Sequence, residues 1–156
     1  MKKTGLLAVC IAIPLLTGGI SGWLTAHEIK GWYAALQKPF FNPPNYVFGP
    51  VWTALYLAMG VSLYRVVRHT SSYRQKAVTI FGIQLVLNFL WSIIFFKLHM
   101  VGLAAADIVL MWLAILAMII TFARMDKPAA WLQVPYLLWV SFATALNFAI
   151  LHLNAV

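Results

Sequence analysis

Five long stretches of the chain are almost free of charged residues, and they constrain the fold more than any other feature. They cover 5–26, 39–64, 77–96, 100–123 and 128–151, and the only charge among them is Asp107. Each stretch supplies the roughly 20 apolar residues that an α-helix needs to cross about 30 Å of hydrocarbon. We therefore expect an all-α integral membrane protein built as a bundle of five transmembrane helices.

The composition leaves little room for anything else. Of the 156 residues, 63% are hydrophobic and 9% are charged, and a soluble domain of this size could not bury so much apolar surface. We expect a single transmembrane domain over 1–156. Its helices are expected at about 5–26, 47–67, 77–96, 100–123 and 129–151, with a loop at about 27–46.

The first apolar run follows Met-Lys-Lys, as in a secretory signal peptide. It is longer than the usual apolar core of about 7–15 residues, and no Ala-x-Ala cleavage site follows it. We interpret it as the first membrane helix. The single cysteine, Cys10, lies within it, which excludes a disulfide framework.

The net charge of +8 comes from the loops and does not indicate nucleic-acid binding. With five crossings, one side of the membrane receives Lys2, Lys3, Arg65, Arg68, Arg74, Lys76, Arg124 and Lys127, and the other receives Lys30, Lys38 and Lys97. Cytoplasmic loops are enriched in Lys and Arg. We therefore expect a cytoplasmic N terminus.

The segment from Trp32 to Tyr56 joins a proline-rich loop to the second helix. Its prolines restrict their own φ and disfavour helix at the preceding residue, so we expect a stiff extended loop over 38–45. Pro50 should lie in the first turn of the next helix, where a missing N–H costs nothing. The aromatic residues of this segment are Trp32, Tyr33, Phe40, Phe41, Tyr46 and Phe48. They suit a lid over the bundle or, equally, an interfacial aromatic belt.

Polar and aromatic residues recur at helical spacing in the later runs: Phe48, Trp52, Tyr56, Gly60 and Tyr64, then Gln84, Asn88 and Ser92, then Pro135, Trp139, Ala143 and Asn147. Amides that faced lipid would lack hydrogen-bond partners, so we expect these faces to point inward. They can line a cavity or simply fill the core. Gly18 and Gly22 allow close helix packing, which we expect within the monomer rather than between monomers.

Asp107 is the one carboxylate within a membrane run. Because a charge in hydrocarbon is costly, it should face the bundle interior, in a functional or a structural role. The four histidines lie in loops or near the C terminus, so haem ligation is not expected. We find no sequence motif for a metal site, a nucleotide-binding loop or a nucleophilic triad.

Three segments together resemble one family: residues 32–56 (WYAALQKPFFNPPNYVFGPVWTALY), 87–96 (LNFLWSIIFF) and 135–147 (PYLLWVSFATALN). They are similar to the translocator protein family (TspO/MBR, the peripheral-type benzodiazepine receptors). The resemblance covers nearly the whole chain and indicates a bacterial member, located in the cell membrane.

The resemblance implies a homodimeric five-helix bundle whose first long loop covers a ligand cavity. It implies binding of protoporphyrin IX and related tetrapyrroles, sterols, and benzodiazepine- or isoquinoline-carboxamide-type ligands, with no required cofactor. By matching motif positions, the ligand-binding residues are Tyr33, Trp52, Asn88, Trp91, Trp139, Ala143 and Asn147. Asn88 and Asn147 are expected to orient the ligand, and Lys30 or Lys38 to meet porphyrin carboxylates at the rim.

Three functions remain open: a tetrapyrrole-binding sensor, scavenger or carrier; light-dependent porphyrin degradation with Trp52 and Trp139 as the catalytic residues; and a transporter or sterol-binding protein. No inverted repeat supports transport. The family's sterol motif in the last helix is incomplete, because Leu146-Asn147-Phe148 is followed by no Lys or Arg.

Overall fold

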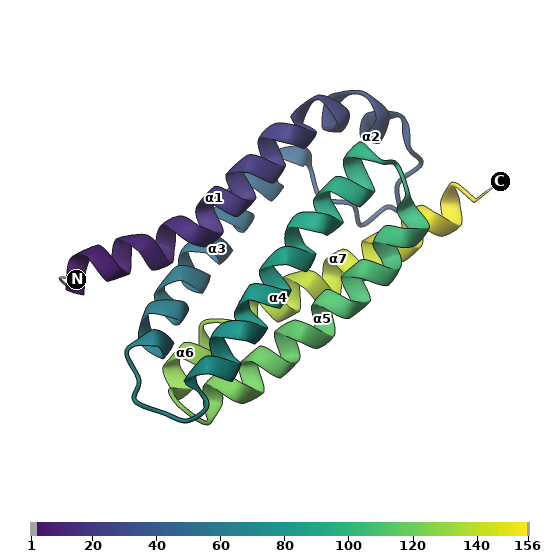
Figure 1. The fold of residues 1–156 in the computed structure, drawn as a ribbon. Helices are drawn as coiled ribbons and strands as arrows, with labels where there is room; N and C mark the ends of the chain where they lie inside the picture. The colour runs from purple at the N-terminus through teal and green to yellow at the C-terminus, as the bar shows by residue number, and fades with distance from the viewer. Residues whose placement is uncertain (1–2, 156) are drawn as a thin grey trace.

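Five long helices run up and down in the computed structural model, which describes residues 3–155 (Figure 1). They are α1 (Lys3–Lys30), α3 (Asn45–Val67), α4 (Arg74–Ser92), α5 (Val101–Ala123) and α7 (Val134–Leu153). α4 continues into a π-helical turn, η1 (Ile93–Lys97), and two short helices, α2 (Trp32–Ala35) and α6 (Lys127–Trp131), precede α3 and α7. All five long segments are apolar enough to cross a membrane, so the expected fold class is confirmed.

The helices pack in a fixed order around the bundle. α1 packs against α3 and the α4–η1 segment, α4 against α5, and α5 against α6 and α7. The two termini lie at opposite ends of the bundle, as an odd number of crossings requires (Figure 1). The core lies between α3, α4, α5 and α7, around Met59, Phe81, Met111 and Tyr136.

α1 and α3 approach closely because two glycines remove side chains from their contact. A Cβ on Gly60 would meet the Ile11 backbone, and a Cβ on Gly18 would overlap the Tyr56 ring. Gly18 therefore packs within the monomer, as expected.

Two helix boundaries differ from those expected from the sequence: the end of α1 and the start of α3. α1 continues to Lys30, beyond the expected end at 26, because charged residues leave the hydrocarbon without breaking the helix. α3 begins at Asn45, earlier than the expected start at 47, so Pro50 lies in the second turn of the helix rather than in the first.

The last membrane segment is broken rather than continuous. Pro135 has no N–H and its ring would clash with the carbonyl four residues earlier, at Trp131, where α6 ends. The structure therefore has α6 and then α7 in place of the single helix expected over 129–151.

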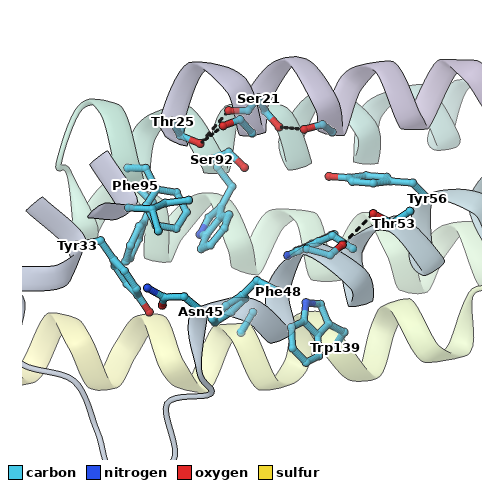
Figure 2. Close-up of a pocket in the computed structure, with 18 of the residues that line it drawn as sticks. Ser21, Thr25, Tyr33, Asn45, Phe48, Thr53, Tyr56, Ser92, Phe95 and Trp139 are labelled. Carbon is cyan, nitrogen blue, oxygen red and sulfur yellow. Dashed lines mark hydrogen bonds between the residues drawn. The ribbon is translucent and has the colours of Figure 1, made fainter. Parts of the chain in front are cut away.

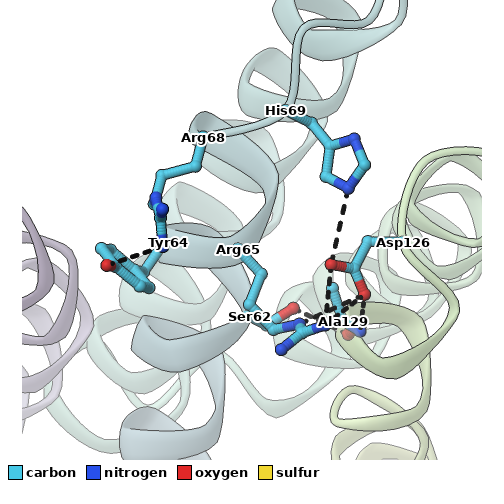
Figure 3. Close-up of polar contacts among 7 residues, drawn as sticks. All are labelled: Ser62, Tyr64, Arg65, Arg68, His69, Asp126 and Ala129. Carbon is cyan, nitrogen blue, oxygen red and sulfur yellow. Dashed lines mark hydrogen bonds and ion pairs between the residues drawn. The ribbon is translucent and has the colours of Figure 1, made fainter.

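Asp126 fixes the start of α6 and ties it to α3 (Figure 3). Its Oδ1 accepts from the Ala129 N–H at 3.0 Å and from Arg65 Nη2 at 3.1 Å, and His69 Nε2 lies 3.7 Å from Oδ2. Burial raises the pKa of Asp126, but the Ala129 N–H and the charges of Arg65 and His69 outweigh it, so the pKa lies below its ordinary value.

Candidate ligand cavity

A cavity of about 350 Å³ lies at the end of the bundle that α2 covers (Figure 2). Its walls come from α1, α2, α3, α4 with η1, and α7. Six of the seven predicted ligand-binding residues line it: Tyr33, Trp52, Trp91, Trp139, Ala143 and Asn147. This volume lies at the low end of the range of about 300–1,000 Å³ for small-molecule sites.

Aromatic pairs form most of the cavity wall. Trp52 stacks on Tyr56 with ring centroids 5.5 Å apart, and Trp91 stacks on Phe95 at 5.3 Å. Trp139 meets Phe48 edge-on at 6.0 Å (Figure 2). These rings hold one another in place along the cavity wall.

Asn88 is the predicted residue that does not line the cavity. It is buried behind Tyr56, whose hydroxyl donates to Asn88 Oδ1 at 2.7 Å, while Asn88 Nδ2 donates to the Tyr136 hydroxyl at 3.0 Å. Tyr136 in turn donates to Gln84 Oε1 at 2.9 Å. The amide side chain is therefore used inside the protein, in contrast to the expected role of orienting the ligand.

Asn147 lines the cavity but is also occupied. It accepts from Trp91 Nε1 at 3.0 Å and donates to the Val101 carbonyl at 3.1 Å. The predicted polar contact thus fixes the Trp91 ring, and it links α4, α5 and α7.

Several polar side chains of the cavity lining make no hydrogen bond within residues 3–155, and not all of them were predicted as ligand-binding residues. Trp139 Nε1 is buried with no hydrogen-bond partner among the described residues. The side chains of Asn45 and Ser92 also line the cavity, and neither hydrogen-bonds within residues 3–155. Ser92 belongs to the stripe of Gln84, Asn88 and Ser92 that was expected to face inward, whereas Asn45, the first residue of α3, belongs to no such repeat.

Helix α1 forms the smooth side of the cavity. Gly19 and Gly22 line it, and a Cβ added at either would meet nothing within 4 Å. Ser21 and Thr25 bond back to their own helix, at the Gly18 and Ser21 carbonyls. The sequence predicted close packing within the monomer at both Gly18 and Gly22. That prediction is wrong for Gly22, which lines the cavity and packs against no other helix.

The cavity is open on one side, between α1 and α3. Among residues 3–155, the exposed side of its lining lies entirely on these helices, at Gly19, Gly22, Asn45, Gly49 and Thr53. Because α1 and α3 are membrane-spanning segments, much of this opening faces the bilayer.

Residues 31–44 connect α1 to α3 and are called the lid below; hydrogen bonds within this segment and to Asn154, the C-cap of α7, hold it in place. The buried Tyr33 hydroxyl donates to Asn42 Oδ1 at 2.9 Å, and the Gln37 N–H donates to Asn154 Oδ1 at 3.0 Å. Burial raises the pKa of Tyr33 and the Asn42 bond only partly offsets this, so the phenol stays protonated at neutral pH. Lys38 is occupied as well, because its Nζ donates to the carbonyls of Ala34 and Leu36.

Asp107 is buried in α5, as expected, and lies outside the cavity lining. Its Oδ2 atom has no hydrogen-bond partner among the described residues. Within the same part of the chain, no three His, Cys, Asp or Glu side chains come together to hold a metal ion.

Comparison with known proteins gives one consistent result. Residues 10–153 match the model of the TspO/MBR family. The chain is 42% identical to the tryptophan-rich protein TspO of Chlorobaculum tepidum over 157 residues, which cover 98% of each chain. It is 41% identical to the TspO of Archaeoglobus fulgidus, over 99% of this chain and 100% of that one. The human translocator protein is 41% identical over 122 residues, covering 76% of this chain and 72% of its own.

Proposed function

This chain belongs to the TspO/MBR family of integral membrane proteins, and on that premise we propose that its cavity binds flat, largely apolar aromatic ligands. The proposed ligand classes are porphyrins such as protoporphyrin IX and compounds of the isoquinoline-carboxamide and benzodiazepine types. Curated relatives carry the names translocator protein and tryptophan-rich sensory protein.

The observation that carries this proposal is the unpaired indole N–H of Trp139 in a wall of stacked rings. A buried donor without a partner costs free energy, which a ligand acceptor would recover. Trp139 Nε1 is buried and has no partner among the described residues, whereas Trp91 Nε1 donates to Asn147 and the Tyr56 hydroxyl donates to Asn88. A ligand with a carbonyl or ring nitrogen beside an aromatic plane satisfies both requirements.

Size separates the two ligand classes. A compound with two or three rings suits the cavity of about 350 Å³. A tetrapyrrole is larger, so we propose that part of its macrocycle emerges between α1 and α3. Since Lys38 is bonded to backbone carbonyls, the porphyrin carboxylates are expected nearer the exposed Asn45 than Lys38.

Light-dependent porphyrin degradation is the second candidate. The observation that favours it is the stacking of Trp52 on Tyr56, with ring planes inclined by 26°. Trp52 and Trp139 would exchange electrons or protons with the excited porphyrin that they contact. Illumination of the purified complex separates this candidate from binding alone: loss of porphyrin absorbance that slows in Trp52→Phe and Trp139→Phe supports degradation, and unchanged absorbance excludes it.

The test of ligand binding removes the indole N–H and keeps an aromatic ring. Trp139→Phe should weaken binding of an isoquinoline carboxamide about 5- to 30-fold, as expected for about 1–2 kcal/mol from one buried hydrogen bond. Trp131→Phe is the matched control, because Trp131 is 70% exposed and outside the cavity lining. Equal affinities in wild type and Trp139→Phe would contradict the proposed contact.

We further propose a homodimer. Gly102 and Ala106 form an exposed pair of small residues on α5, whereas Gly18 packs within its own chain. Such pairs permit close contact between helices. Mass measurement in lipid nanodiscs should give twice the chain mass, and Ala106→Leu should reduce it; a monomer in wild type rejects this proposal.

A further inference from the structure

Three residues from separate segments meet outside the cavity lining, next to Phe95, which does line it. Glu28 lies in the last turn of α1, Trp32 begins α2, and His99 lies in the turn between η1 and α5. Glu28 Oε2 and His99 Nε2 are 3.0 Å apart. The Trp32 and His99 rings stack with centroids 4.2 Å apart and planes inclined by 15°.

His99 adopts an unusual backbone conformation to make these contacts. Its φ is 58°, and it is the only residue other than glycine with positive φ within 3–155. Glycine is common in this conformation just after a helix, because it has no Cβ to clash. A strained residue that makes two specific contacts points to a functional constraint.

The cluster is connected to the cavity through Trp32. The Trp32 ring meets Phe95 edge-on at 5.7 Å, and Phe95 lines the cavity. The neighbouring residue, Tyr33, also lines the cavity and packs on Phe95 at 6.1 Å. Holding Trp32 therefore holds α2 and its cavity-facing Tyr33 in position.

We infer that Glu28, His99 and Trp32 form a latch that holds α2 over the cavity and that tightens when His99 is protonated. This rests on the proposed function, since it concerns regulation of the same cavity. A protonated His99 makes a charge-assisted hydrogen bond to Glu28 and a cation–π contact with Trp32. When α2 lifts away, the contact between Trp32 and His99 is lost. Because protonation of His99 strengthens that contact, it favours the state in which α2 covers the cavity. Histidine changes charge between about pH 5 and 8.

The other charged groups near the latch do not replace His99. His27 Nδ1 lies 3.7 Å from Glu28 Oε1, and its side chain is 96% exposed. Lys30 at the end of α1 and Lys97 at the end of η1 make no ion pair with Glu28 in the described part of the chain. α2 has no charged residue, and on α5 the first is Asp107. His27 is therefore the competitor to control for.

The test measures how fast a ligand leaves the closed cavity. An uncharged isoquinoline carboxamide is bound to the full chain in nanodiscs, and its dissociation is followed at about pH 5.5 and about pH 8. Dissociation should be about two- to fivefold slower at the lower pH, as expected for one partly exposed ionic and cation–π contact. In His99→Gly this difference should disappear, and that variant should fold because glycine accepts the φ of His99.

A control and a ligand-free readout keep the two proposals separate. His27→Gln should retain the pH difference, and Glu28→Gln should reduce it. In ligand-free protein, hydrogen-exchange protection factors of the amides at 32–36 should rise at the lower pH in wild type but not in His99→Gly. If the wild type binds no ligand at either pH, the proposed function is wrong. The latch is then tested by hydrogen exchange in the ligand-free protein alone. Protection that is independent of pH, or a pH response that persists in His99→Gly, overturns the latch.

Discussion

Asn88 joins three helices through a single amide, since it bonds Tyr56 of α3 and Tyr136 of α7 from its own place in α4. Asn147 does the same for Trp91 and the Val101 carbonyl. The Asn88 bonds are buried within the hydrocarbon, where a polar group without a partner is costly, and the Asn147 bonds are partly buried. At this scale, these two amides orient the aromatic wall, so the proposed ligand is expected to meet the rings rather than the amides.

Removal of the Tyr56 hydroxyl should therefore affect stability more than binding. Tyr56→Phe keeps the ring that stacks on Trp52 but leaves Asn88 Oδ1 without its donor. We expect a loss of about 0.6–2 kcal/mol in unfolding free energy, with ligand affinity nearly unchanged. Unfolding in detergent measures the first quantity. Tyr46→Phe is the control, because Tyr46 is 79% exposed. A Tyr56→Phe variant as stable as wild type would contradict this role for Asn88.

At the scale of elements, α6 and its cap show how a break in a membrane segment is stabilised. Pro135 prevents a continuous helix, and Asp126 then satisfies the Ala129 N–H at the start of α6. Ser62 of α3 donates to the Ala129 carbonyl at 2.7 Å, so both sides of this turn are anchored.

The charge of Asp126 should give a pH-dependent contribution to stability. Its pKa is lowered in the folded protein from an ordinary 3.8. The contribution is therefore fully present above that value and lost as pH falls through the lower folded pKa. At neutral pH Asp126→Asn should lose about 0.2–1 kcal/mol, since Arg65 is 42% exposed and screened by solvent. The difference from wild type should shrink below about pH 4. Unfolding over a pH series checks this, and a difference that grows in acid would refute it.

The α1 wall gives a second prediction at this scale. Gly22→Leu should place a side chain in the opening between α1 and α3, where nothing lies within 4 Å of an added Cβ. Crowding of about 1–3 kcal/mol corresponds to roughly 5- to 150-fold weaker ligand binding. Gly82→Leu is the control, because Gly82 also faces open space but lies outside the cavity lining. Equal binding by Gly22→Leu and Gly82→Leu would place the opening elsewhere.

The sequence predicted the elements better than the cavity. Charge-free runs identify what crosses the membrane, so the five-helix class followed directly. They do not mark where a helix ends, because α1 extends through His27, Glu28 and Lys30. The helical spacing of Gln84, Asn88 and Ser92 shows that Asn88 faces the interior of the bundle. It does not show whether Asn88 lies in the core behind Tyr56 or in the cavity wall. The α1 wall is formed by Gly19 and Gly22, which have no side chains, so a pattern of polar and apolar side chains cannot predict it.

At the scale of the whole molecule, the charge distribution predicts one orientation. Residues 68–73 and the N terminus lie at one end of the bundle, and the lid and C terminus at the other (Figure 1). In a Cys10→Ala background, Phe40→Cys should react with an impermeant thiol reagent in intact cells and Ser72→Cys should not. Phe40 is fully exposed on the lid, so its labelling does not depend on lid opening. Labelling of Ser72→Cys alone would reverse the orientation.

The most direct test of the cavity is porphyrin titration followed by quenching of tryptophan fluorescence. Trp52→Ala and Trp139→Ala should each weaken protoporphyrin IX binding by about 1–3 kcal/mol, through lost burial and stacking. That is roughly 5- to 150-fold in dissociation constant. Trp131→Ala should bind like wild type, because Trp131 lies outside the cavity lining. If all variants fold and Trp131→Ala weakens binding as much as the other two, the ligand does not bind in this cavity.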